Sequence, residues 1–401
     1  MPFPLHLFNP QSFPRLTPRR VTLVRFVRAV AGFAQIDASD PDDHGFNLDP
    51  TFANAHGPAF GICGPDGATP AQQCRIRVMR DRIEPAVQLF PEIVDAGLVS
   101  LVTPATGAPL TPGDTITVRA ARNPAADTST TLKLHAGTAA GPVVGECTIR
   151  VHPLITIPVK GHRCIINGTQ ADTDEAAFNT LIANANKILI AAGVKLNLEL
   201  PLLNTDVVGF TTANAVTLTS STHWDAEMAK LMRKDPQNGA LNVYVVGHID
   251  DLAANGTTSR DDTNGVGISS VFANSNRASG SYVGAQVGFL MRDPDDLEGF
   301  AQTLCHELGH VLTLEHYNNK NGSSIHHNNW SMRNLMYNFA YINAGDPMDQ
   351  IGYGDHLHAL PGGAHLSVGM AIGVKKMANL FQSNQAHIMR TAANNGTYLP
   401  V

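Results

Sequence analysis

Residues 297–312 combine a continuous apolar stripe with two histidines on the opposite side. Between residues 297 and 312, apolar side chains recur at every third or fourth position, as in a helix with one buried face. The stripe consists of Leu297, Phe300, Ala301, Leu304, Leu308, Val311 and Leu312. Asp293 and Pro294 are typical of a helix start. The pattern predicts a helix that packs on a core and presents His306 and His310, one turn apart, on its opposite face.

The residues on that opposite face have the chemistry of a zinc site. Two imidazoles one helical turn apart can bind the same zinc ion. Glu307 lies between them, is rotated away from the ligand direction, and is suited to contact a water molecule that the metal activates. His316 follows the helix and could supply a third ligand if the chain turns there. We therefore predict one catalytic zinc ion held by His306, His310 and His316; the alternative is a solvated or capping histidine pair.

Residues 306–316, HELGHVLTLEH, resemble the metzincin signature HExxHxxGxxH, closest to its matrixin-like form. Residues 334–337, NLMY, resemble the methionine turn of that family, so Met336 is expected to pack beneath the histidines. The chain departs from the family at Thr313, which stands where metzincins have glycine. A β-branched residue resists the positive φ that this glycine allows, so the turn would be built differently or His316 would be displaced.

The resemblance implies a zinc-dependent endopeptidase that acts on protein or peptide substrates. In such enzymes zinc polarises the scissile carbonyl, and the glutamate, here Glu307, is the general base that takes a proton from water. The strand expected at residues 282–291 would correspond to the edge strand that holds the substrate in extended form.

The chain divides into three parts by composition. Residues 1–95 are rich in Pro, Gly and Asp and are expected to form an irregular leader, similar to a propeptide, with a short helix near residues 80–89. Residues 96–155 contain short β-type runs between turn residues, which predicts a small immunoglobulin-like β-sandwich. Residues 156–401 would form the zinc peptidase domain.

The third part predicts an α+β fold with a mixed twisted sheet, an active-site helix and a C-terminal helix. Residues 172–192 have a capping-box start and one apolar face, so they are expected to be helical. Residues 194–200 alternate as a half-buried strand does, and residues 241–249 are nearly all apolar, as in a central strand. A last helix is expected at residues 366–381.

Cys63 begins a CGPD segment that resembles, with one residue missing, the cysteine switch of latent matrixins. A thiolate is a good fourth zinc ligand, so Cys63 could hold the site inactive. The alternatives are a disulfide between Cys63 and Cys74 or a plain turn. The chain has five cysteines, an odd number, so at least one is unpaired within a monomer.

Charge and hydropathy exclude some classes of partner. The net charge of −6 gives no sign of nucleic-acid binding, and no apolar run is long enough to span a bilayer. Residues 19–34 make a poor signal peptide because arginines interrupt their apolar part. We expect a secreted or exported protein without a cleaved signal, although a cytoplasmic address before export stays open. The acidic clusters at residues 40–43 and 261–262 could bind Ca²⁺ but lack EF-hand spacing.

Two other functions remain open from the sequence. The chain could be a binding or structural protein in which zinc only stabilises the fold, or an exported protease toxin or effector. Glu307 argues against a purely structural zinc site, which needs no such carboxylate. The sequence does not indicate the oligomeric state.

Overall fold

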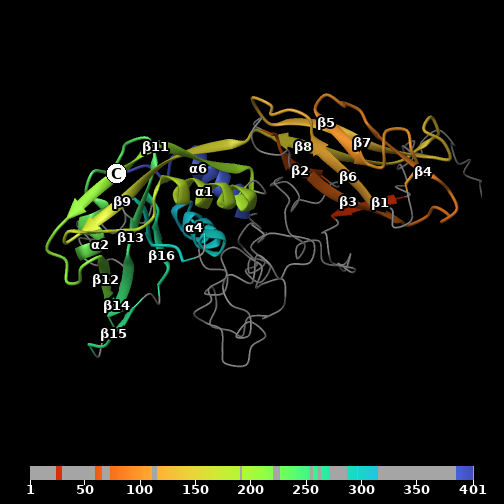
Figure 1. Ribbon diagram of the computed structural model, residues 1–401. Helices are drawn as coiled ribbons and strands as arrows, with labels where there is room; N and C mark the ends of the chain where they lie inside the picture. The colour runs from red at the N-terminus through yellow and green to blue at the C-terminus, as the bar shows by residue number, and fades with distance from the viewer. Residues whose placement is uncertain are drawn as a thin grey trace, which may run out of the picture.

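Strands make up most of the ordered secondary structure. The computed structural model describes residues 24–28, 59–65, 73–110, 115–189, 192–219, 226–252, 256–260, 263–270, 287–295, 297–314 and 385–400. Within these ranges the strands form four separate sheets, accompanied by few helices (Figure 1). The predicted α+β, metzincin-like fold is therefore wrong, because the described residues form mainly strands, spread over several sheets.

Two four-stranded sheets form a β-sandwich between residues 24 and 152. The first sheet has the order β1 (Val24–Arg28), β3 (Gln73–Arg80), β6 (Thr115–Ala120), β5 (Val99–Thr103). The second has the order β2 (Ala59–Cys63), β8 (Val143–His152), β7 (Thr128–Ala136), β4 (Leu89–Ile93). Apolar side chains from both sheets form one buried cluster, which is the core of the sandwich.

The sandwich uses strands from the segment that we expected to be an irregular leader. In β3, Ile76 and Val78 are buried and Arg77 between them is exposed, the alternation of a half-buried strand. The expected helix near residues 80–89 is also wrong. Turns and bends occupy residues 81–88, where the Arg80 guanidinium donates to the carbonyl oxygens of Glu84 and Val87. The strands thus join residues on both sides of the predicted boundary at residue 95, while the boundary at 155 stays a prediction.

A six-stranded sheet forms the centre of the second unit, between residues 155 and 400. Its order is β10 (Thr169–Gln170), β9 (Ile155–Ile166), β13 (Leu241–Val246), β17 (Gly288–Arg292), β16 (Gly265–Ile268), with β11 (Val194–Val207) also paired to β9. β11, β9, β13 and β17 run parallel, whereas β16 pairs with β17 in the antiparallel direction. Every residue of β13 is buried, as predicted for a central strand. The strand expected to be the edge, β17, is internal, and β16 lies outside it.

A small third sheet of the second unit comprises β12 (Ala215–Thr219), β14 (His248–Leu252) and β15 (Thr258–Arg260). The helices described are α1 (Glu175–Leu189), α2 (Ala226–Met232), α4 (Leu297–Val311) and α6 (Gln385–Asn394). Among the described residues no helix is long and apolar enough to cross a membrane. The helix expected at residues 366–381 lies outside the described residues.

Helices α1 and α4 pack against each other beside the six-stranded sheet (Figure 1). The Cys305 thiol of α4 donates to the Ala185 carbonyl of α1 at 3.5 Å, deep in the core. The apolar face predicted for α1 is buried. Its N-cap is Asp174, whose carboxylate accepts from the Ala177 amide, rather than the predicted Asp172. Asp293, expected to cap α4, accepts instead from the backbone just before α1.

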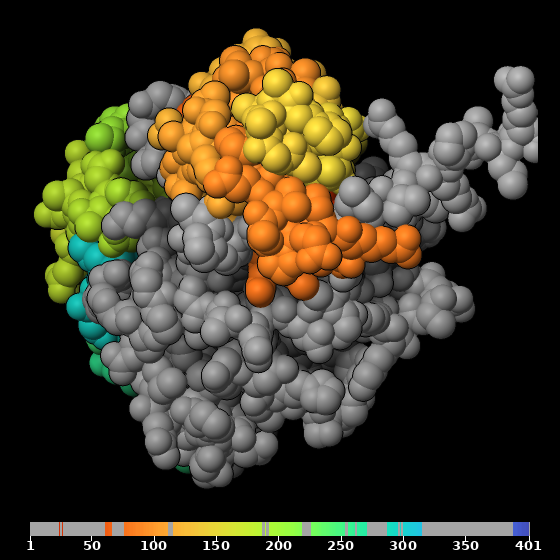
Figure 2. Space-filling model, turned by 90° about the vertical axis from the view of Figure 1, so that its right-hand side faces the viewer, coloured from red at the N-terminus to blue at the C-terminus, as the bar shows by residue number. Residues whose placement is uncertain are grey.

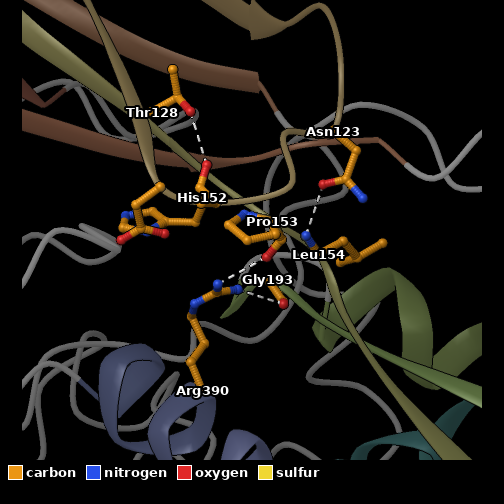
Figure 3. A network of polar contacts seen from close by, with 9 residues as sticks. Asn123, Thr128, His152, Pro153, Leu154, Gly193 and Arg390 are labelled. Carbon is orange, nitrogen blue, oxygen red and sulfur yellow. Dashed lines mark hydrogen bonds and ion pairs between the residues drawn. The ribbon is translucent and has the colours of Figure 1, made fainter.

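The sandwich and the second unit meet at a polar junction (Figure 3). Arg390 of α6 donates to the carbonyl oxygens of Gly193 and Pro153 at 2.7 and 2.8 Å, and the Asn123 amide oxygen accepts from the Leu154 amide. We call the two bonds of Arg390 the arginine clasp. In the face shown in Figure 2, the sandwich residues, orange to yellow, lie above and beside residues of the second unit, lime to cyan.

Candidate functional site

Helix α4 brings the two predicted histidine ligands together. The ring centroids of His306 and His310 lie 5.0 Å apart, with an angle of 84° between the ring planes. His306 is buried, and His310 is partly exposed. The apolar stripe faces α1 and the sheet, so both rings project from the opposite side of the helix. Two imidazoles on one helix face are therefore adjacent, as the sequence predicts.

The tautomer of His310 is fixed by a backbone contact. Its Nδ1 atom lies 2.9 Å from the carbonyl oxygen of Leu314. A carbonyl oxygen only accepts, so Nδ1 carries the proton and donates. The Nε2 atom then keeps its lone pair, which is the form in which a neutral imidazole binds a metal.

Thr313 makes the turn that brings the Leu314 carbonyl to His310. Thr313 has a φ of +69°, the left-handed conformation that glycine usually supplies at a helix end. The Leu314 amide donates to the carbonyl oxygen of Gly309 at 2.8 Å, and the Thr313 amide donates to the backbone carbonyl oxygen of His310 at 2.9 Å. These are the paired bonds of a Schellman motif. The β-branched residue thus adopts the conformation that we expected it to resist, because these two bonds hold it there.

The carboxylate of Glu307 is held between α4 and β16. Its Oε2 atom accepts a hydrogen bond from the Gly267 amide at 2.7 Å. Burial raises the pKa of Glu307 to about 8, and the hydrogen bond from Gly267 opposes that rise. The carboxyl group is thus positioned by a strand as well as by its own helix.

Two glycines of β16 allow this close approach. A Cβ atom at Gly267 would lie 2.2 Å from the carbonyl oxygen of Glu307, and one at Gly265 would lie 3.1 Å from the Glu307 Cγ atom. The backbone of the helix therefore leaves no room for a side chain at Gly267, and the Glu307 side chain leaves little at Gly265. Sequence reasoning missed Gly267 as a site residue, although glycine within a strand is a signal of close backbone approach.

Two of the three predicted zinc ligands lie among the described residues, and both are imidazoles, a group that binds zinc. His306 and His310 supply two adjacent imidazoles. The hydrogen bond from His310 Nδ1 to the Leu314 carbonyl leaves the Nε2 lone pair of His310 available for a metal. Among the described residues there is no group of three or more His, Cys, Asp and Glu side chains able to hold a metal ion. His316 and Met336 lie outside the described residues, so the third ligand and the methionine turn remain predictions.

Cys63 lies at the junction of the two units. Its side chain is fully buried, and its thiol donates to the carbonyl oxygen of Gly64 at 3.5 Å. Gly193 separates it from the arginine clasp, since a Cβ there would lie 3.2 Å from the sulfur and 2.4 Å from an Arg390 nitrogen. Cys63 packs with the core of the second unit as a thiol. Its role as a latency ligand stays a prediction.

Comparisons with known proteins assign the chain to no family. No family model matches the sequence, and no curated protein matches it. Among the solved structures that match, two show weak likeness to this chain. One is a family 123 glycoside hydrolase from Clostridium perfringens, with a TM-score of 0.19 and 6% identity over 61% of this chain and 52% of that one.

The other is a 2,6-sialyltransferase from Vibrionaceae Photobacterium sp. JT-ISH-224, with a TM-score of 0.15 and 8% identity over 48% of this chain and 36% of that one. The chain thus spans about half of the first protein and about a third of the second. Both proteins are enzymes. TM-scores this low carry no argument about the fold or the function of this chain.

The assignment to the metzincins is therefore corrected. It rested on residues 306–316 and 334–337, and no family model extends that likeness. The described residues contain no complete metal-binding group and form a mainly β structure, so they do not support the metalloprotease family or the metal site that it implies. What remains is the local chemistry of α4 and β16.

Proposed function

We propose that the chain is a zinc-dependent endopeptidase in which Glu307 is the general base. The observation that supports this most is the position of Glu307. Its carboxylate lies beside the paired imidazoles of α4 in sequence and contacts the backbone of β16 in space. One turn of α4 carries this carboxylate and two adjacent histidines, and the carboxylate contacts β16. Metal-assisted hydrolysis of an extended peptide would use groups of these kinds.

His306 and His310 would hold the metal. Bound there, zinc would polarise a carbonyl group, lower the pKa of a water molecule and favour the ionised form of Glu307. Glu307 takes a proton from that water and passes it to the leaving amine. The Gly267 amide keeps the carboxylate in place during both transfers, because it is fixed in the β16–β17 ladder.

A peptide substrate is favoured by the outer position of β16 in the six-stranded sheet. β16 pairs with β17 on one side only, among the described strands. An extended peptide can add to such an edge through main-chain hydrogen bonds. Its scissile bond would then pass beside Glu307, which contacts the middle of β16.

The test compares the full chain with two carboxylate variants. Zinc content is measured by elemental analysis, and cleavage of a peptide library is measured with and without a chelator. Glu307→Gln should keep its zinc and lose at least about a hundredfold in cleavage rate, the range of general-base catalysis. Glu199→Gln, an exposed carboxylate of β11, should match the parent.

Two outcomes would contradict the proposal. Cleavage by Glu307→Gln at the parent rate would show that Glu307 is not the general base. A parent that binds zinc, unfolds in chelator and cleaves nothing would be a zinc-stabilised binding or structural protein.

A further inference from the structure

A buried polar group without a partner lies on α4, one turn before His306. Gln302 is only 2% exposed, and within the part of the chain that the structure describes its Oε1 atom has no hydrogen-bond partner. Buried amide oxygens without a partner are rare, since burial removes the water that would otherwise bond to them. A partner absent from the structure is the natural explanation.

The position of Gln302 indicates which group that partner is. Residues four apart on a helix are neighbours on its surface, and helical side chains lean toward the N-terminus over the preceding turn. We therefore expect the His306 ring to lean toward Gln302. By helical spacing, Gln302 lies on one side of the His306 direction and Glu307 on the other.

A histidine that binds a metal through one ring nitrogen almost always donates its other N–H to an acceptor, which fixes its tautomer and orientation. His310 has such an acceptor in the Leu314 carbonyl. We propose that Gln302 is the equivalent positioning residue for His306, whose ring N–H it accepts when His306 binds the metal. This inference rests on the proposed zinc site.

An acceptor that forms its hydrogen bond only when the metal is bound lowers the stability of the metal-free fold, because its buried oxygen then has no partner. Replacing Gln302 by an apolar residue of similar shape removes a buried, unpartnered oxygen, which stabilises the metal-free fold. The same change removes the acceptor that orients His306, which weakens zinc binding. A residue with a merely structural role moves both properties in the same direction.

The experiment measures zinc affinity by chelator competition and the urea midpoint of the metal-free chain. Gln302→Met should lower zinc affinity about ten- to a hundredfold and leave the urea midpoint equal or higher. Gln302→Glu, which keeps an acceptor oxygen, should retain affinity near that of the parent. Thr303→Val, a buried polar change on the same turn, should leave affinity within about twofold.

Each result decides the question. Unchanged zinc affinity in Gln302→Met, with zinc bound by the parent, would overturn the role of Gln302 and leave the zinc site standing. A fall in affinity for Thr303→Val equal to that of Gln302→Met would also overturn it. A parent that binds no zinc would overturn the proposed function together with this inference.

Discussion

The backbone N–H of Gly267 lies 2.7 Å from Oε2 of Glu307, so a strand holds the carboxylate of a helix that follows it forty residues later in the chain. The contact requires glycine, because a Cβ at Gly267 would lie 2.2 Å from the Glu307 carbonyl oxygen. Backbone atoms on both sides prevent an easy adjustment.

Gly267→Ala should therefore push α4 away from β16. We expect a loss of about 1–3 kcal/mol in unfolding free energy, the usual cost of overpacking, together with a large fall in cleavage rate. Urea unfolding and peptide cleavage measure the two effects. Gly97→Ala is the control, because its Cβ would meet only the end of the Asp95 side chain at 3.3 Å. Equal stability of the two variants would show that the helix and strand are not in tight contact.

Thr313→Gly should stabilise the chain. The left-handed conformation of Thr313 costs an L-residue about 1–2 kcal/mol, and glycine adopts it freely but is more flexible when unfolded, so a net gain of about 1 kcal/mol is expected. The matched control is Thr180→Gly on the exposed side of α1, which should lose about 0.3 kcal/mol, because threonine is itself a weak helix former. Urea unfolding of both variants measures the difference. Destabilisation of Thr313→Gly by as much as the control would mean that residue 313 is not left-handed.

The stability of the second unit should fall as the pH drops from 7 to 5, through His162. Its ring is fully buried, and both ring nitrogens are bonded, to Thr205 and Asn242 at 2.9 Å. Burial lowers the pKa of His162 to about 4 from its ordinary value of 6.5. A lowered pKa means that the fold prefers the neutral ring, so stability is complete above pH 6.5 and declines as the pH falls toward 4.

The loss of unfolding free energy caused by His162 is about 2 kcal/mol between pH 7 and pH 5. Urea titrations at several pH values measure it. His162→Gln, which can still form hydrogen bonds but does not titrate, should remove most of this slope whatever its own stability. A slope that is the same in the parent and in His162→Gln would assign the pH dependence to other groups.

Loss of the arginine clasp should loosen the junction between the two units. Arg390→Met leaves the carbonyl oxygens of Gly193 and Pro153 without their charged donor, which should cost about 3 kcal/mol of unfolding free energy. Arg390→Lys keeps the charge but has no planar fork for two carbonyls, so an intermediate loss is expected. Urea unfolding and limited proteolysis of residues 152–155 measure the effect. Full resistance to proteolysis in Arg390→Met would show that other contacts hold the junction.

Periodic patterns predicted the elements near the site well. The apolar faces of α1 and α4 follow from apolar residues at every third or fourth position, the pattern of a helix with one buried face. The buried strand β13 follows from a nearly continuous apolar run. The sandwich strands β1 to β4 were missed, since short strands among proline and glycine resemble loops when their partners are unknown. Pairing partners such as Gln73 and Arg119 lie far apart in sequence, and no local pattern links them.

The candidate site shows the same division. Spacing alone predicted that His306 and His310 would be adjacent, and the structure confirms it. Spacing did not predict that Thr313 would take the left-handed conformation, because two backbone bonds at the helix end outweigh a side-chain preference. Nor did it predict the Gly267 contact, which depends on how closely a strand and a helix approach each other.

The arginine clasp also orders events in the biosynthesis of the chain. Arg390 bonds to a carbonyl that is 237 residues earlier. At about 5–20 residues per second, a ribosome adds those residues in roughly 10–50 s. The sandwich can fold during that interval, while the Pro153 carbonyl still faces water. The two bonds of the clasp thus form only after α6 emerges, so a nascent chain that stalls earlier would carry a folded sandwich whose junction lacks them.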